Sequence, residues 1–423
     1  MKFLKITLLV VMSGVFTSFV NAQTDRVSFI HGLNSEPSVW NTMDSELSSI
    51  FDFSSSNISY ASNNFISGSA STVFIPDGSV VVAHSEGGLL AREYLRQKGN
   101  DKLKALITVG TPNLGAPIAN NIANGKVVST VENWLEDLSA GPRYFAGPLF
   151  GDSFAQNVLD YLNISGTSLA TRFLDSYLLS NYETSSAVND MKVGSQFMNT
   201  LNANPNSTLP NARYAIYGVE QFQSHVRLIT SVNRQNNNGN PVETGQGLVP
   251  YYYATSVYFF VTLYSLYTAY QFYYYYINSD FSDPYYFFYY DQYQYWLGAG
   301  KEWGKGLITL AGKMHFDWET QIVGSDFSLS RLDLEESDAF IPKRSQAPGF
   351  FEISGDGIFR ILKANGANHV EETHHPSVKN RLEQIFVFSD VNIPKITGNG
   401  GGIDPPPPPP EDCFPLFVCP TEN

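Results

Sequence analysis

The chain has 423 residues, a formal net charge of −14 at pH 7 and only 16% charged residues. An acidic chain poor in Lys and Arg is unsuited to nucleic acid or to anionic surfaces, so we expect no nucleic-acid partner. The length allows two or three domains, but we expect one domain with large insertions. The two cysteines, Cys413 and Cys419, leave no Cys/His cluster, and we expect neither a metal nor a cofactor.

The first 22 residues have the pattern of a secretory signal peptide. A positive start, MKFLK, precedes an apolar stretch from Ile6 to Val20 and the small-residue end Val20-Asn21-Ala22. Cleavage after Ala22 would leave a mature chain that begins at Gln23. We therefore expect an exported protein, either secreted, periplasmic or bound to the cell surface; the alternative is an uncleaved membrane anchor.

Residues 394–423 have the composition of a linker and tail. Glycines at 398 and 400–402 are followed by six prolines at 405–410, a combination that predicts a flexible hinge and a stiff spacer. Cys413 and Cys419 are spaced for a small disulfide loop in an exported chain. The folded body is expected to span residues 23–393, and the tail is either disordered or presents its loop to a partner.

Strand and helix patterns alternate along the body. The predicted strands are 26–30, 58–60, 79–83, 105–109, 213–218 and 359–362, and the predicted helices include 38–51 and 88–98. This alternation predicts an α/β fold with a doubly wound, mostly parallel sheet and helices on both faces.

Two stretches, 118–211 and 221–317, interrupt the alternation and are predicted insertions. Seventeen of the 25 tyrosines lie between Tyr251 and Tyr295, and residues 244–279 carry no charged side chain. Residues 257–277 are long enough for a membrane span, but tyrosine prefers interfaces. We expect instead a cap, or lid, that makes transient contact with a lipid interface, or else an ordinary packed aromatic insertion.

The segment VVVAHSEGGLLAREYL, from Val80 to Leu95, predicts a strand, a sharp turn and a helix. Such a turn presents a serine as a nucleophile when the residues two before and two after it are small. Ala83 and Gly87 meet that requirement around Ser85. The alternative is a small-residue turn that happens to contain a serine.

An activated serine needs a base and an acid that orients the base. His369 follows the predicted last strand and is the candidate base, with His374 and His375 as alternatives. Asp338 is the candidate acid and Asp356 its rival.

The oxyanion formed in acyl transfer needs preorganised N–H donors. The first candidate donor is the backbone N–H of Glu86, at the start of the predicted helix. The second is the N–H of Leu33, because Gly32 permits close approach of the backbone after the first strand. The sequence His31-Gly32 on its own would indicate only a turn.

Five separated motifs resemble those of the α/β-hydrolase superfamily, in its lipase/esterase branch of bacterial lipases, lecithin–cholesterol acyltransferase-like and GPI-inositol-deacylase-like proteins. The motifs are VSFIHGLNSEPSVW at 27–40, VVVAHSEGGLLAREYL at 80–95, ALITVGTPNLGAP at 105–117, SDAFIPKRSQAPG at 337–349 and GANHVEETHHPSVKNRLEQIF at 366–386. The resemblance implies that the nucleophile is Ser85, the acid Asp338 and the base His369.

The chain departs from the family pattern at four positions. Ala83 replaces a glycine, Asn113 replaces a frequent histidine, and Ala339 follows the acid where glycine is usual. Glu86 occupies a position that is more often apolar. Its acidic side chain is expected to lie beside the oxyanion hole and to disfavour anionic acyl groups.

These inferences together predict an exported serine hydrolase of carboxylic esters, with lipid-like substrates and no cofactor. An acyltransferase on the same fold is the first alternative. The second is a non-catalytic adhesion or polymer-binding module that uses the aromatic insertion. Fold alone does not fix the substrate.

Overall fold

The computed structural model describes residues 25–127, 129–130, 133, 185–220, 234–235, 241–242, 265, 267–279, 283–330, 333–355 and 357–396. The predicted signal peptide, the tail from residue 397 onward with both cysteines, Asp356 and His225 lie outside the described residues.

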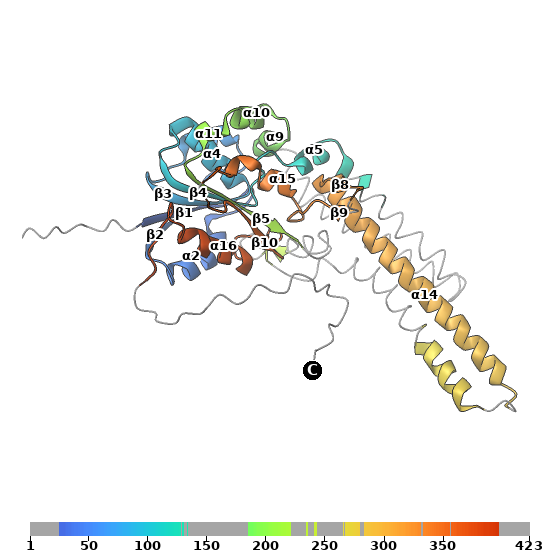
Figure 1. The fold of residues 1–423 in the computed structure, drawn as a ribbon. Helices are drawn as coiled ribbons and strands as arrows, with labels where there is room; N and C mark the ends of the chain where they lie inside the picture. The colour runs from blue at the N-terminus through green and yellow to red at the C-terminus, as the bar shows by residue number, and fades with distance from the viewer. Residues whose placement is uncertain are drawn as a thin grey trace, which may run out of the picture.

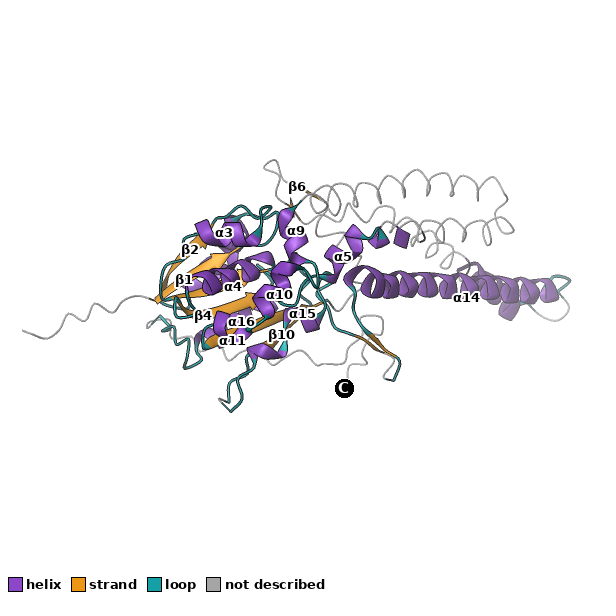
Figure 2. Ribbon diagram, turned by 90° about the horizontal axis from the view of Figure 1, so that it is seen from above, coloured by secondary structure: helices purple, strands orange, loops and turns teal. Residues whose placement is uncertain are grey.

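A six-stranded, fully parallel sheet forms the centre of the molecule (Figure 2). Its spatial order is β10-β5-β4-β3-β1-β2. Because the chain adds strands on one side of β1 and then on the other, the carboxyl ends of β1 and β3 meet at the point where the strand order reverses, which is where such sheets bind ligands. The strands are β1 (Asp25–Ile30), β2 (Phe53–Ile58), β3 (Ser79–His84), β4 (Leu103–Val109), β5 (Ala212–Val219) and β10 (Ile361–Asn365).

Helices cover both faces of the sheet (Figure 1). Alternate strand residues point to opposite faces and enter two separate cores: Val81 packs in one, and Val80 and Val82 in the other. The first core lies under α3 (Ile66–Thr72), α4 (Glu86–Lys98), α9 (Ser186–Met191), α10 (Gln196–Asn202) and α11 (Pro205–Thr208). The second lies under η1 (Pro37–Trp40), α2 (Asn41–Ser48) and α16 (Pro376–Phe386). The predicted fold class is confirmed.

The predicted strand boundaries differ from the observed ones mainly at the two edges of the sheet. The strand predicted at 58–60 is β2, Phe53–Ile58, whose FSSSNI sequence has no apolar alternation because it is a polar edge strand. The other edge strand was predicted at 359–362 but begins at Ile361, since Phe359 is exposed to solvent. The helix predicted at 38–51 divides into η1 and α2, and it ends at Ser48.

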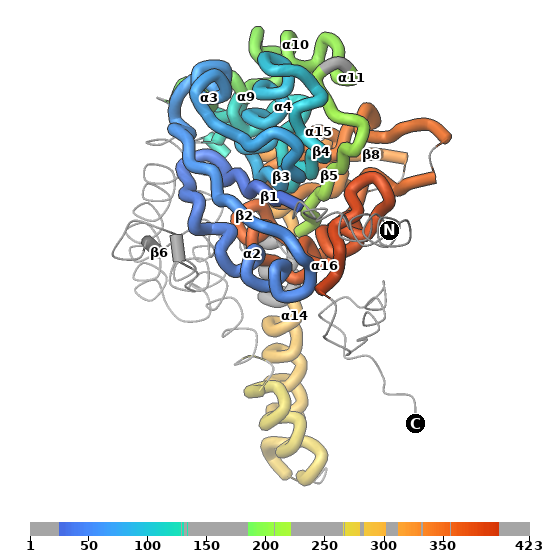
Figure 3. The backbone as a smooth tube through the Cα atoms, turned by 90° about the vertical axis from the view of Figure 1, so that its left-hand side faces the viewer, coloured from blue at the N-terminus to red at the C-terminus, as the bar shows by residue number. Residues whose placement is uncertain are grey.

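The second insertion contains a long projection, the aromatic arm, which we define as residues 267–278 and 285–317, the second range being Tyr285 followed by helix α14 (Tyr286–Asp317). The arm extends away from the sheet (Figures 1 and 3). Rings of its two helices contact one another in antiparallel order: Tyr276 meets Tyr286, and Tyr275 meets Tyr289. Among the described residues, no helix combines the length and apolar character needed to cross a bilayer.

The chain leaves the arm without a break in the helix. Helix α14 continues directly into the π-helix η3 (Trp318–Val323), which packs against α5 (Pro117–Ala123). The remaining described elements are β6 (Arg234–Gln235), β7 (Pro241–Val242), β8 (Phe327–Ser328), β9 (Asp333–Leu334), α15 (Lys343–Gln346) and η4 (Gly349–Phe351).

Candidate active site

Ser85 lies in a strained turn between β3 and α4. Its φ of 53° is in the left-handed region, which is costly for a residue with a side chain. Neighbouring segments approach the turn so closely that a Cβ on Gly87 would overlap the carbonyl of His31, and one on Gly88 would overlap Thr111. Position 87 therefore has no room for a side chain, as predicted, and position 88 has none either. The turn fixes Ser85 at the carboxyl edge of the sheet.

The structure brings Ser85, His369 and Asp338 into one hydrogen-bonded chain. The Oγ of Ser85 lies 2.9 Å from Nε2 of His369, and Nδ1 of His369 lies 2.7 Å from Oδ2 of Asp338. A neutral imidazole with its proton on Nδ1 donates to the carboxylate and accepts from the serine hydroxyl. The ring of Phe340 stacks on that imidazole at 5.2 Å between centroids. All three predicted side chains therefore meet in one chain of hydrogen bonds.

Asp338 lies in a tight turn, residues 338–341, that its own side chain organises; we call it the acid turn. Its carboxylate is fully buried, and Oδ1 accepts hydrogen bonds from the N–H groups of Phe340, at 2.9 Å, and Ile341, at 2.6 Å. The backbone N–H of His369 donates to the carbonyl of Asp338 at 2.9 Å. Ala339 has a φ of 73°, which explains why glycine is usual after the acid. The turn therefore fixes the orientation of the second carboxylate oxygen toward His369.

The two candidate oxyanion donors lie on either side of Ser85. Glu86 is the first residue of α4, so its N–H has no acceptor within the helix. On the other side, a Cβ on Gly32 would lie 2.8 Å from the Cβ of Ser85, and Leu33 follows directly. Gly32 therefore allows the backbone that carries the N–H of Leu33 to approach the nucleophile.

An apolar cavity of about 20 Å³ adjoins Ser85 and His369. This volume is enough for roughly one water molecule. The wall consists mainly of apolar side chains from the β1 loop, the loop after β4, α5, α9 and the acid turn: Leu33, Pro112, Ala116, Ile118, Ala119, Met191, Phe340 and Ile341.

The expectation that Glu86 places a charge beside the oxyanion hole is wrong. Its side chain is fully buried and does not line the cavity. Burial raises the pKa of this carboxyl well above its usual range, and the nearby Asp190 raises it further. The Glu86 side chain is therefore not exposed to the cavity that adjoins Ser85.

The other candidate bases lie away from Ser85. His374 is exposed, and the side chain of His375 caps α16 by accepting a hydrogen bond from the N–H of Ser377. His315 belongs to α14. His374 is therefore a surface residue and His375 a helix-capping residue.

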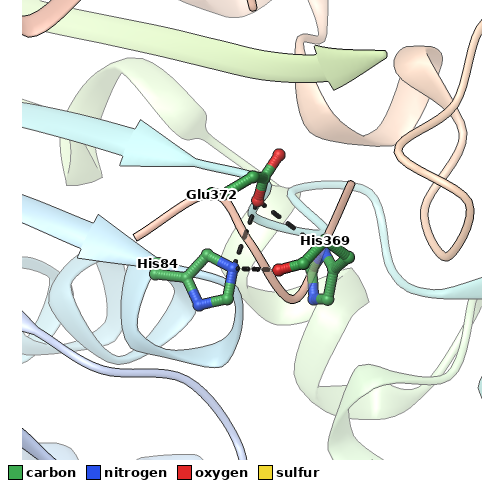
Figure 4. A group of neighbouring side chains, drawn as sticks. All are labelled: His84, His369 and Glu372. Carbon is green, nitrogen blue, oxygen red and sulfur yellow. Dashed lines mark hydrogen bonds and ion pairs between the residues drawn. The ribbon is translucent and has the colours of Figure 1, made fainter. Parts of the chain in front are cut away.

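Sequence reasoning missed two buried residues, His84 and Glu372, that lie against the candidate base (Figure 4). Nε2 of His84 lies 2.9 Å from the carbonyl oxygen of His369 and 3.1 Å from Oε2 of Glu372. Burial, and then the nearby His369, lower the pKa of His84 well below its usual value, so it remains neutral. The signal available was proximity in sequence, since His84 precedes Ser85 and Glu372 follows His369 by three residues.

His84, His369 and Glu372 form a group that could in principle ligate a cation. The donor set does not fit one here, because Nδ1 of His369 is within hydrogen-bonding distance of Asp338 and Nε2 of His84 is within that distance of a carbonyl. We therefore treat the group as a hydrogen-bonding cluster.

The strand order, the strained serine after β3 and the histidine loop after β10 define an α/β-hydrolase fold. Residues 58–231 match the family model described as a PGAP1-like alpha/beta domain. The expected resemblance to the α/β-hydrolase superfamily is confirmed by this match together with the fold.

Solved structures similar to this chain include a lipase from Bacillus licheniformis in its mature form, with 10% identity, a TM-score of 0.38 and coverage of 86% of this chain and 91% of that chain. An esterase from Rhodococcus sp. has 14% identity, a TM-score of 0.25 and coverage of 47% and 73%. Lipase 1 from Pelosinus fermentans has 13% identity, a TM-score of 0.26 and coverage of 52% and 80%. No curated protein matches the chain.

Proposed function

We propose that this protein is an exported serine hydrolase of carboxylic esters and that Ser85, His369 and Asp338 are its catalytic triad. The observation that carries the proposal is the continuous chain of hydrogen bonds from Ser85 through His369 to Asp338, at 2.9 and 2.7 Å. The strained turn presents the serine, and the neighbouring cavity is apolar. These features are those that acyl transfer through a covalent intermediate requires.

The reaction proceeds in two stages. The Oγ of Ser85 attacks the ester carbonyl while Nε2 of His369 takes its proton, and the N–H groups of Leu33 and Glu86 stabilise the oxyanion. His369 then returns the proton to the leaving alcohol, which departs and leaves an acyl-enzyme. Water, deprotonated by His369, releases the acid and regenerates the hydroxyl of Ser85.

We further propose that the substrates are lipid-like and that the aromatic arm contacts the lipid interface. The cavity wall is apolar, as an acyl chain requires. Aromatic side chains on the arm are exposed, including Tyr285 and Phe287 at 60% each. Amphipathic aromatic rings are favoured at membrane–water interfaces. The proposal that the protein is exported rests on the signal-peptide pattern of the first 22 residues. It is tested by measuring the mass of the mature chain, which is expected to begin at Gln23.

The test is hydrolysis of p-nitrophenyl esters of increasing acyl length by the mature protein and by Ser85→Ala. We expect the variant to lose activity by a factor of roughly 10⁴ or more, and longer chains to be preferred. Equal activity of the two proteins would refute Ser85 as the nucleophile. Absence of hydrolysis at every length would refute a general esterase and favour the acyltransferase or binding-module alternative.

A further inference from the structure

Glu372 occupies a space that two neighbouring strands leave for it. Its carboxyl group is fully buried between Gly110, which follows β4, and Gly218, in β5. A Cβ on Gly110 would overlap Oε2 of Glu372, and a Cβ on Gly218 would overlap Oε1. The two glycines and the carboxyl group therefore fit together as one packed unit directly beneath the His369 loop.

This carboxyl group faces the same imidazole nitrogen as Asp338 does. Oε2 of Glu372 lies 3.8 Å from Nδ1 of His369, whereas Oδ2 of Asp338 lies 2.7 Å from that atom. The titratable groups around Glu372 are His84 from β3, His369 from its own loop and Asp338 from the acid turn. Two carboxyl groups thus converge on one N–H, and only one of them is within hydrogen-bonding distance.

The surroundings of Glu372 disfavour its ionised form. Burial, and then the charge of Asp338, raise the pKa of Glu372 well above its usual range. Loss of the Asp338 carboxylate would remove the second of these two effects and bring Glu372 closer to ionisation.

We propose that Glu372 is a second, reserve acid for the His369 base, and thus a positioning residue that can orient the imidazole when Asp338 cannot. This proposal rests on the proposed catalytic triad. A movement of about 1 Å brings Oε2 within hydrogen-bonding distance of Nδ1. His84 steadies the same loop, because its Nε2 lies within hydrogen-bonding distance of the carbonyl of His369.

The first test compares kcat/KM across pH for the wild type, Asp338→Ala, Glu372→Gln and the double variant. Loss of the orienting acid in a triad costs about 10⁴-fold when nothing replaces it. We expect Asp338→Ala to lose roughly 10- to 100-fold, and the double variant about 10⁴-fold. Activity of Asp338→Ala should rise with pH as Glu372 ionises, and this rise should be absent from the double variant.

Two further variants separate this role from a structural one. Asp338→Ser keeps an acceptor for the N–H groups of the acid turn and replaces the alanine variant if that variant does not fold. Glu371, the buried neighbour of Glu372, supplies the matched control, so Asp338→Ala with Glu371→Gln should behave like Asp338→Ala alone. If Asp338→Ala is as inactive as the double variant with Glu372→Gln, Glu372 is not a reserve acid.

A second readout needs no substrate. An imidazole N–H bonded to a carboxylate gives a far-downfield proton resonance in NMR spectra. We expect this signal from His369 to persist in Asp338→Ala and to vanish when Glu372→Gln is added. Its absence from Asp338→Ala would overturn the proposal even if no ester is hydrolysed. If the wild type hydrolyses no ester but the signal persists in Asp338→Ala, the proposed function is refuted, whereas the contact of Glu372 with His369 is supported.

Discussion

At the scale of single residues, the site depends on close approaches that only small side chains allow. Gly32 lets its backbone pack directly against Ser85. Gly87 leaves room for the carbonyl of His31, and Gly88 leaves room for the side chain of Thr111. This close packing maintains the strained backbone of Ser85. Ser85 was predictable from its strand–turn–helix pattern and His369 from the loop after the last predicted strand, whereas Asp338 needed the family motif around it. His84 and Glu372 were missed although they are near Ser85 and His369 in sequence, because proximity in sequence does not show whether a polar side chain is buried.

The buried Glu86 makes stability depend on pH in a definite direction. Its pKa is raised in the folded state, so its contribution to stability is present below the unfolded pKa of about 4.3 and is lost as pH rises toward the folded pKa. The free energy of unfolding of Glu86→Gln, relative to wild type, should therefore rise by up to roughly 1.4 kcal/mol per pH unit above about pH 5. Urea unfolding at several pH values measures this difference.

Glu336 provides a control of opposite sign for that experiment. Partial burial acts to raise its pKa, but hydrogen bonds from Lys363 and Lys343 outweigh burial and lower it. Its stabilising contribution is therefore present above its unfolded pKa and is lost as pH falls. Glu336→Gln should become less stable relative to wild type as pH rises. Slopes of the same sign for the two variants would contradict the raised pKa of Glu86.

At the scale of elements, η3 connects the aromatic arm to the acid turn and to the cavity wall. Nε1 of Trp318 donates to the carbonyl of Ala339 at 2.8 Å, and Oε2 of Glu319 accepts from the hydroxyl of Ser337 at 2.8 Å. Nδ2 of Asn121, in α5, donates to the carbonyl of Ile322 at 2.9 Å. Displacement of the arm would therefore reach both the residues that flank Asp338 and helix α5, which lines the cavity.

Trp318→Phe tests this connection. The change leaves the carbonyl of Ala339 without its buried donor, which costs about 1–3 kcal/mol of unfolding free energy. Because Ala339 adjoins the acid, we also expect kcat on a soluble ester to fall several-fold. Tyr94→Phe is the matched control, since it removes a buried hydrogen bond to the carbonyl of Ile75, remote from the site. An equal loss of kcat in both variants would show that the effect is general destabilisation.

The element pattern of the body was predictable because buried parallel strands read as apolar runs. The edge strands were not: β2 contains three consecutive serines, and the apolar Phe359 lies outside β10. The arm was predictable only as an insertion. Ring contacts between residues far apart in sequence, such as Tyr273 with Tyr293, determine its antiparallel pairing, and composition carries no information on such pairing.

At the scale of the whole molecule, the arm extends far from the sheet (Figure 3), and its exposed side chains include aromatic rings. If it contacts lipid, replacement of Tyr285, Phe287 and Phe288 by serine should reduce cosedimentation with phosphatidylcholine vesicles about tenfold or more, since roughly 1.4 kcal/mol is lost per factor of ten. Hydrolysis of a short soluble ester should not change. Neutral vesicles are the appropriate probe because the chain carries a net charge of −14.

Two exposed aromatic residues outside the arm supply the control for vesicle binding. Phe74 and Phe359 are 77% and 82% exposed, and neither belongs to the arm. Their replacement by serine should leave cosedimentation unchanged. If the arm variant binds vesicles as well as the wild type, the proposed lipid contact is wrong, and the arm needs another explanation.

The most direct test of the account is covalent labelling of the wild type by diethyl p-nitrophenyl phosphate, followed by peptide mass spectrometry. An activated serine attacks the phosphorus and retains the diethylphosphoryl group. We predict one adduct per chain, on Ser85, with labelling slowed by at least about 10³-fold in His369→Ala. No adduct on Ser85, or labelling at an equal rate without His369, would contradict the assignment of Ser85 as a nucleophile activated by His369.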